Sequence, residues 1–205
     1  MMIAIITGDI IKSRTVAVEQ WLPVLESVLS KFGSKEKDWE IFRGDSFQLE
    51  VSVENVIKTS LYLKTVIKTI GMLDVRIGIG IGEKNFVGDT IKESNGEAFI
   101  YSGEAFEALR KKTLRIKTRS IKINQQLNLI FDVLMFIVDK WNVNISKTIR
   151  LALDFPDLTQ TELAQKMNKK QSQISRELNK SGFEEVFKMV ELCQQIINND
   201  AAIYS

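Results

Sequence analysis

The sequence of 205 residues contains no histidine, one cysteine and two prolines. Without histidine it cannot build a Ser-His-Asp or Cys-His nucleophile, an imidazole-ligated zinc site or a histidine general base. The single cysteine, Cys193, cannot form an internal disulfide, and its apolar helical surroundings predict packing rather than reactivity. Any chemistry must therefore use carboxylates, lysine, arginine, hydroxyl groups or a bound metal ion.

Long apolar runs are also missing. The longest apolar stretch, 127–138, is too short for a membrane span and contains Asp132, and no cationic leader precedes an apolar segment. Together with the lone cysteine, these absences predict a cytoplasmic protein that does not bind membranes. The net charge of +2 is too small to indicate nucleic-acid binding by itself, so local clusters must carry that argument.

The first part of the chain, residues 1–123, alternates between strand and helix patterns. The expected elements are, in chain order, a strand at 2–7, a helix at 16–32, a hairpin within 39–51, a helix at 56–70, a strand at 74–82, a helix at 96–112 and a strand at 114–123. This order predicts an α+β domain with an antiparallel or mixed sheet and its helices on one face. A ferredoxin-like core is the natural candidate.

The second part, residues 124–205, carries helical patterns only. We expect helices at 125–141, 145–154, 159–167, 170–180 and 183–198. The change places a domain boundary near Asn124, followed by an all-α domain. No linker rich in proline, glycine or serine marks this boundary, so the two domains are expected to pack closely or to share the long helix.

Two Gly-Asp steps stand at the ends of expected strands. Asp9 follows the first strand, and Asp45 lies inside the hairpin. If these strands are neighbours, the two carboxylates converge, and carboxylates without histidine are the ligands that Mg2+ prefers, usually together with a phosphate group. The pair therefore predicts a Mg2+ site for a phosphorylated ligand. The structural alternative is that each aspartate caps a helix or a turn.

Two further patterns leave alternatives open. Gly78, Gly80 and Gly82 do not have the spacing of a dinucleotide-binding fingerprint, and we expect them to relieve crowding against a helix. The segment 110–122 holds seven cations and no acidic residue. It could bind phosphates or DNA, or its lysines could protect an edge strand from aggregation.

Residues 158–178 have the pattern of two helices joined by a tight turn. Thr159 and Glu162 form a capping box, and Asn168 can take the left-handed conformation of the turn. The segment resembles the helix-turn-helix of bacterial DNA-binding regulators, and an ordinary helical hairpin is the alternative. The residues expected to contact base edges or phosphates are Lys169, Lys170, Gln171, Ser172, Gln173, Ser175 and Arg176.

Three stretches of the first domain resemble the core of class III nucleotide cyclases and related palm-type domains. They are Ile-Thr-Gly-Asp-Ile-Ile-Lys-Ser at 6–13, Phe-Arg-Gly-Asp-Ser-Phe at 42–47 and Arg-Ile-Gly-Ile-Gly-Ile-Gly at 76–82. The resemblance, over about residues 1–120, implies that Asp9, Asp45 and the carbonyl of Ile10 bind Mg2+. It also implies that a nucleotide lies against Lys12, Ser13, Arg14, Arg43 and Arg76.

The sequence departs from the cyclase pattern after the third stretch. Cyclases carry there a helix with an asparagine and an arginine that stabilise transition-state charge, but Lys92 and Gly96 stand at those places, or Glu107 and Arg110 in a shifted register. Neither register restores both groups, and the loss of one such donor costs about 3 kcal/mol or more. Nucleotide binding is therefore favoured over cyclisation.

A degenerate cyclase-like domain followed by a helix-turn-helix is similar to the SatD family of bacterial proteins, over nearly the whole chain. We therefore expect a transcriptional regulator that binds double-stranded DNA as a homodimer and senses a nucleotide or other phosphorylated ligand with Mg2+. The alternative is an enzyme, a Mg2+-dependent nucleotidyl cyclase or transferase acting on nucleoside triphosphates, whose helical domain is an interaction module. A third possibility is that the first domain is a metal-free dimerisation platform.

Overall fold

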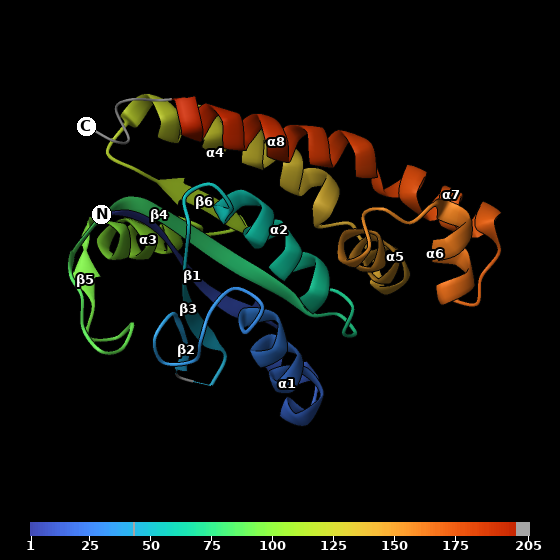
Figure 1. The fold of residues 1–205 in the computed structure, drawn as a ribbon, viewed down its shortest axis with the longest axis horizontal. Helices are drawn as coiled ribbons and strands as arrows, with labels where there is room; N and C mark the ends of the chain where they lie inside the picture. The colour runs from blue at the N-terminus through green and yellow to red at the C-terminus, as the bar shows by residue number, and fades with distance from the viewer. Residues whose placement is uncertain (43, 200–205) are drawn as a thin grey trace.

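The computed structural model describes residues 1–42 and 44–199, and it is an α+β structure (Figure 1). The first part contains β1 (Met2–Ile11), a 3-10 turn (Ser13–Thr15), α1 (Val18–Leu29), β2 (Trp39–Phe42), β3 (Ser46–Val51), α2 (Val56–Ile67), β4 (Asp74–Phe86), β5 (Asn95–Gly96), α3 (Glu97–Glu107) and β6 (Leu114–Lys117). The described residues that follow form helices only, namely α4 (Ile121–Val138), α5 (Val143–Asp154), α6 (Gln160–Lys166), α7 (Gln171–Ser181) and α8 (Phe183–Asn199).

The strands form one mixed sheet in which β1 is central. The order is β2-β3-β1-β4 with antiparallel neighbours, and β6 pairs with β4 in parallel. β1 has this position because its residues are apolar on both faces of the sheet. Ile3 and Ile5 pack on one face and Ala4 and Ile6 on the other, and all four are buried. The end of β1 therefore lies between the β2–β3 turn and the start of β4.

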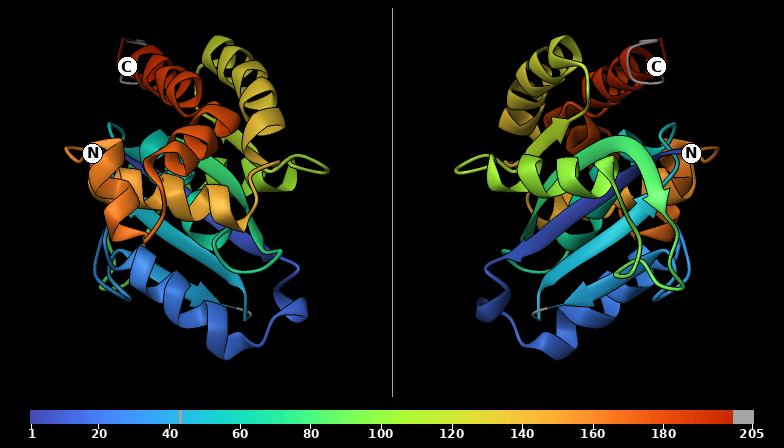
Figure 2. Two further views of the ribbon diagram at one scale, coloured as in Figure 1. Left: turned by 90° about the vertical axis from the view of Figure 1, so that its right-hand side faces the viewer. Right: turned by 90° about the vertical axis from the view of Figure 1, so that its left-hand side faces the viewer.

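The expectation that the helices lie on one face is wrong, since helices cover both faces (Figure 2). α1 and α2 cover one face, and α3 lies on the other, directly over β4 and β1. The reason is the glycine row of β4. A Cβ atom at Gly78 or Gly80 would overlap the backbone of α3, and one at Gly82 would lie 2.7 Å from Cβ of Glu97. The expectation that these glycines make room for a helix is confirmed.

The expected basic strand at 114–123 is too long, because it ends at Lys117 and α4 begins at Ile121. The side chain of Asn124 closes the turn, accepting from the backbone N–H of Thr118 at 2.8 Å and donating to its carbonyl at 2.9 Å. Ser120 then caps α4 by accepting from the N–H of Ile123 at 3.4 Å. These local polar contacts outweigh the β pattern of the segment.

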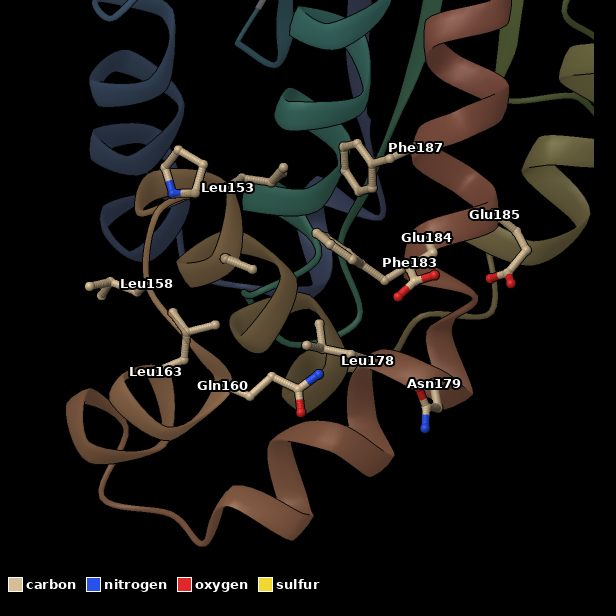
Figure 3. Close-up of a pocket in the computed structure, with 12 residues that line it drawn as sticks. Leu153, Leu158, Gln160, Leu163, Leu178, Asn179, Phe183, Glu184, Glu185 and Phe187 are labelled. Atoms are coloured by element: carbon tan, nitrogen blue, oxygen red, sulfur yellow. The ribbon is translucent and has the colours of Figure 1, made fainter.

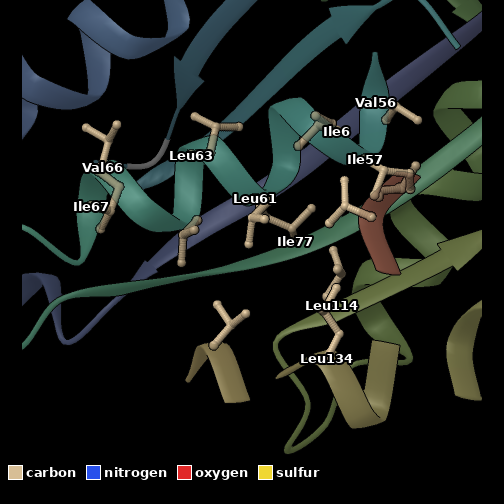
Figure 4. Close-up of a cluster of buried hydrophobic side chains, with 14 of the residues drawn as sticks. Ile6, Val56, Ile57, Leu61, Leu63, Val66, Ile67, Ile77, Leu114 and Leu134 are labelled. Atoms are coloured by element: carbon tan, nitrogen blue, oxygen red, sulfur yellow. The ribbon is translucent and has the colours of Figure 1, made fainter. Parts of the chain in front are cut away.

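The buried apolar residues on both sides of the expected domain boundary form one continuous cluster. Ile6 and Ile77 of the sheet, Leu61 of α2, Leu114 of β6 and Leu134 of α4 belong to it (Figure 4). Cys193, on α8, is fully buried in the same cluster, and burial raises the pKa of its thiol to about 12. This finding fits the expectation that Cys193 packs rather than reacts.

A buried network of ion pairs also crosses the boundary. Nζ of Lys64, in α2, lies 2.9 Å from Oδ1 of Asp74 and 3.0 Å from Oδ1 of Asp139, just beyond α4. Lys68 bonds the other oxygen of Asp74 at 2.9 Å. Burial acts to raise the pKa of Asp74, but the charges and hydrogen bonds of the two lysines outweigh it and hold that pKa below its ordinary value.

One helix in the described residues, α4, is long and apolar enough to cross a membrane by length and composition alone. That property is weak evidence, because the core helix of a soluble protein has it too. Six residues of α4 are buried in this structure, from Ile123 to Val138.

Candidate functional site

A cavity of about 500 Å³ lies where β1 ends. Its lining combines the segment 9–14 with Asp45, Arg76 and the segment 110–113, and we call it the β1 pocket. The sheet explains the assembly, since Asp9 is paired in register with Ser46 of β3 on one side and with Arg76 of β4 on the other. The sequence-predicted residues Asp9, Ile10, Lys12, Ser13, Arg14, Asp45 and Arg76 all line this pocket.

Arg76 makes a two-pronged ion pair with Asp9. Nε donates to Oδ1 of Asp9 at 2.9 Å, and a terminal nitrogen donates to Oδ2. The hydrogen bond to Asp9 raises the pKa of the Arg76 guanidinium; burial opposes the shift, and the charges of Asp9 and Asp45 add to it. The guanidinium carbon also lies 5.5 Å from the ring centroid of Phe106 at the end of α3. Arg76 is therefore fixed on both sides.

Asp45 is tied to the loop that follows β1. Ser13 donates from Oγ to Oδ2 of Asp45 at 2.6 Å, and the carbonyl of Asp45 accepts from the N–H of Ile10 at 3.1 Å. Lys12 makes this possible by taking a left-handed conformation with φ 62°, which turns the chain back toward the hairpin. Asp9 and Asp45 thus converge as the sequence predicts.

Positive charge dominates the β1 pocket. Six cations face the two carboxylates, a surplus of four positive charges, and these cations are Lys12, Arg14, Arg76, Arg110, Lys111 and Lys112. The last three were not assigned to the pocket from the sequence. The signal available was the absence of acidic residues in 110–122, and the shifted cyclase register already placed Arg110 near the catalytic helix.

The rest of the basic segment has a different role. Arg115 pairs with Asp132 of α4 at 2.9 Å, Arg119 with Glu97 of α3 at 3.1 Å, and Lys117 with Glu104. These three cations therefore fix the edge strand β6 and its flanks to the neighbouring helices. Of the seven cations in the segment 110–122, Arg110, Lys111 and Lys112 line the β1 pocket.

The residues of the pocket do not fit a Mg2+ ion held as the cyclase resemblance implies. Both oxygens of Asp9 are bonded to Arg76, and Asp45 accepts from Ser13. A divalent ion here would have to displace a guanidinium and face the repulsion of the surrounding cations. Arg43, the remaining predicted nucleotide contact, lies outside the described residues.

The segment predicted to be a helix-turn-helix forms two helices joined by a turn, α6 and α7. Thr159 and Glu162 form the capping box, and Asn168 takes the left-handed conformation with φ 50°, both as predicted. Ile174 and Leu178 of α7 are buried against the other helices. The two helices lie at the end of the molecule farthest from β5 (Figure 1).

The opposite face of α7 is polar and exposed. Among the predicted DNA contacts, Ser175 is partly buried, and the exposed ones are Lys170, Gln171, Ser172, Gln173 and Arg176. Lys169 is different, because its Nζ lies 2.9 Å from both carboxylate oxygens of Glu177 and is held against α7. The side chain of Gln173 accepts from the N–H of Lys170 at 2.9 Å and helps to cap α7.

A second cavity, of about 620 Å³, lies between the end of α5 and helices α6, α7 and α8 (Figure 3). Phe183, Phe187 and Leu153 supply much of its apolar lining, with Glu184 and Glu185 beside them. The lining includes no sequence-predicted site residue. The β1 pocket is smaller, but it holds the converging carboxylates and cations, so its chemistry makes it the stronger candidate site.

Comparison of the chain with protein-family models, curated proteins and solved structures gave no match. The function of this protein is therefore inferred from its fold and from the geometry of the β1 pocket and of the exposed face of α7.

Proposed function

We propose that this protein is a dimeric cytoplasmic transcriptional regulator, which binds double-stranded DNA through α7 and a nucleotide or other phosphorylated ligand through the β1 pocket. The observation that carries the proposal is the exposed polar face of α7, which lies opposite the buried stripe of the same helix. In helix-turn-helix proteins this face of the second helix enters the major groove. Gln171, Ser172 and Arg176 then reach base edges or phosphates.

The topology of the sheet supports a palm-type first domain. The order β2-β3-β1-β4 with antiparallel neighbours, built from two βαβ halves, is the arrangement of ferredoxin-like folds. A domain of this kind followed by a helix-turn-helix is the arrangement of the SatD family, to which we propose this protein is related. The surplus of cations in the β1 pocket supports the phosphorylated ligand.

An exposed apolar stripe on α4 supports the dimer. Leu129, Val133 and Phe136 follow one another at helical spacing and are 68%, 53% and 69% exposed. Apolar side chains gathered in this way favour association, and a dimer gives a helix-turn-helix protein two half-sites on DNA.

The test is a binding assay on DNA. Random duplexes are selected against the purified protein, and the affinity of the selected duplex is compared with that of a scrambled one by fluorescence anisotropy at fixed salt. Arg176→Ala is expected to weaken binding to the selected duplex by about 1–3 kcal/mol and to relax the sequence preference. Lys58→Ala, which removes an exposed cation of α2, is the matched control and should leave both affinities unchanged.

Failure of the selection to enrich any sequence would contradict the DNA half of the proposal. Equal losses for Arg176→Ala and Lys58→Ala would also contradict it, because they would indicate binding to the net charge of the protein rather than to the face of α7.

One observation favours the enzyme alternative, namely that Asp9 and Asp45 meet at one edge of the sheet. Under that alternative the purified protein converts a nucleoside triphosphate with Mg2+ to a cyclic or transferred product, and Asp9→Asn abolishes turnover. Chromatography of the reaction products tests it directly. The ion pair between Asp9 and Arg76 makes ligand binding the better supported function.

A further inference from the structure

Arg76 is the cation that engages Asp9, the carboxylate that the cyclase resemblance assigns to a metal ion. Both carboxylate oxygens of Asp9 accept from its one guanidinium, a pairing with fixed geometry. We propose that the β1 pocket binds a chain of two or more phosphates without a divalent metal ion, with Arg76 as the cation beside Asp9. This inference rests on the proposed function, because it concerns the same ligand and the same pocket.

The charges around the pocket support this ligand class. Lys12, Arg14, Arg110 and Lys111 line the pocket and form no ion pair with any residue in the described ranges. Lys112 differs, since its Nζ lies 2.9 Å from Asp132. A single phosphate group carries about two negative charges at neutral pH. Even with the carboxylate of Asp45 counted against them, these four cations leave a surplus of three positive charges, which matches a diphosphate or triphosphate better than a single phosphate.

These cations can do for the phosphates what a metal ion does elsewhere. Divalent ions in nucleotide sites neutralise the charge of neighbouring phosphates and fix their geometry. Here the neutralising charges come from two directions, the loop after β1 and the segment after α3. A metal bound to Asp9 would first need to break a charge-assisted pair, which makes the metal-free mode the one that this pocket favours.

The floor of the pocket is already rigid. The bonds from Ser13 to Asp45 and from Ile10 to the carbonyl of Asp45 hold the loop that carries Lys12 and Arg14 against the hairpin. A ligand therefore meets these cations on a backbone that is already in place, and the ordering cost that remains is that of their exposed side chains. The volume of about 500 Å³ is also of the size found for small-molecule sites.

Isothermal titration calorimetry with inorganic tripolyphosphate tests the inference on the protein of 205 residues. In buffer with excess EDTA we expect saturable binding of tripolyphosphate. The affinity for orthophosphate should be lower by a factor of about ten or more, because orthophosphate contacts fewer cations. Added Mg2+ should weaken the binding of tripolyphosphate, since the ion neutralises the phosphates in solution. Binding that occurs only with Mg2+ would overturn the inference.

Substitution of Asp9 gives opposite results for the two modes of binding. Without a metal, Asp9→Asn releases Arg76 and removes a negative charge, so the affinity in EDTA should rise, whereas Arg76→Ala should lower it about tenfold. In a metal site, Asp9→Asn removes a ligand and abolishes the Mg2+-dependent binding. Lys188→Ala, an exposed cation of α8 outside the pocket, is the control and should bind as the parent does. Circular dichroism checks that each variant is folded.

The outcomes separate this inference from the proposed function. If tripolyphosphate binds only with Mg2+, and Asp9→Asn abolishes that binding, the pocket is a phosphate site as proposed and only the metal-free mode is wrong. If tripolyphosphate, pyrophosphate and nucleoside triphosphates all fail to bind with and without Mg2+, the inference and the ligand half of the proposed function are both wrong.

Discussion

The two candidate sites differ in the sequence distance between the residues that contact each other. In the β1 pocket, Asp9 pairs with Arg76, 67 positions away. At the start of α6, Thr159 and Glu162 bond each other across three positions. The pocket exists only when the whole sheet is assembled, whereas the cap of α6 can form from its own short segment. The pocket is therefore a product of the global fold, and the cap of α6 is a product of local sequence.

The largest effect is expected from breaking the buried long-range network at the junction of the two parts. Lys64→Met removes the ammonium that lies between Asp74 and Asp139 and leaves Asp74 buried with one of its two ion-pair partners, Lys68. The loss of one member of a buried pair costs about 3–5 kcal/mol of unfolding free energy. Urea denaturation followed by tryptophan fluorescence measures the change.

The matched control is Lys58→Met on the same helix, where the lysine is exposed. We expect a change within about 0.5 kcal/mol there. Similar losses for the two variants would mean that the apolar replacement, and not the buried charge, causes the effect. A loss confined to one of two separate unfolding transitions would show that the two parts of the chain do not unfold together.

A smaller effect is expected from removing the local cap. Thr159→Ala deletes the hydroxyl that accepts from the N–H of Glu162 and should destabilise the protein by about 1 kcal/mol. Because the contact is local, amide hydrogen exchange should accelerate in α6 and α7 while β1 and β4 keep their protection. Thr161→Ala, an exposed position in the same helix, is the control. Uniform acceleration in all elements would contradict the contrast between local and global contacts.

The smallest change in the free energy of unfolding at neutral pH is expected from the protonation of Asp74, and this change increases as the pH falls. Its pKa in the folded protein is lowered by Lys64 and Lys68, which outweigh burial, and the unfolded value is about 3.9. The stabilisation is thus fully present above about pH 4 and is lost as the pH falls through the lower folded value. Urea midpoints measured from pH 7 down to pH 3 should decline in the parent. The decline should be shallower in Asp74→Asn, and an identical acid profile would refute this assignment.

The same contrast explains how much could be predicted from the sequence. The order of strands and helices, the capping box at Thr159 and the turn at Asn168 follow from short-range patterns, and all are present. The convergence of Asp9 and Asp45 was also predicted, because Gly-Asp steps at strand ends meet once the strands are neighbours. The boundaries of the basic strand were wrong, since the cap at Ser120 outweighs a β pattern.

The sequence could not predict the partners of the charged residues. The ion pair between Arg76 and Asp9 depends on the register of β1 with β4, which only the assembled sheet defines. In the same way, the turn at Arg110, with φ 49°, directs part of the basic segment to the pocket while the rest pairs with α3 and α4. The position of α3 on the second face of the sheet was not predicted, because the sequence did not show which face Gly78, Gly80 and Gly82 belong to.

The glycine row of β4 also limits how this protein can change during evolution. Because α3 lies on bare backbone at Gly78, Gly80 and Gly82, even the smallest side chain is too large there, and its polarity or charge makes no difference. Gly103, on α3 itself, has open space around the place of a Cβ atom. Natural variants are therefore expected to tolerate many residues at position 103 and only glycine at the three positions of β4. The short distance between β4 and α3 should then be the same in all of these variants.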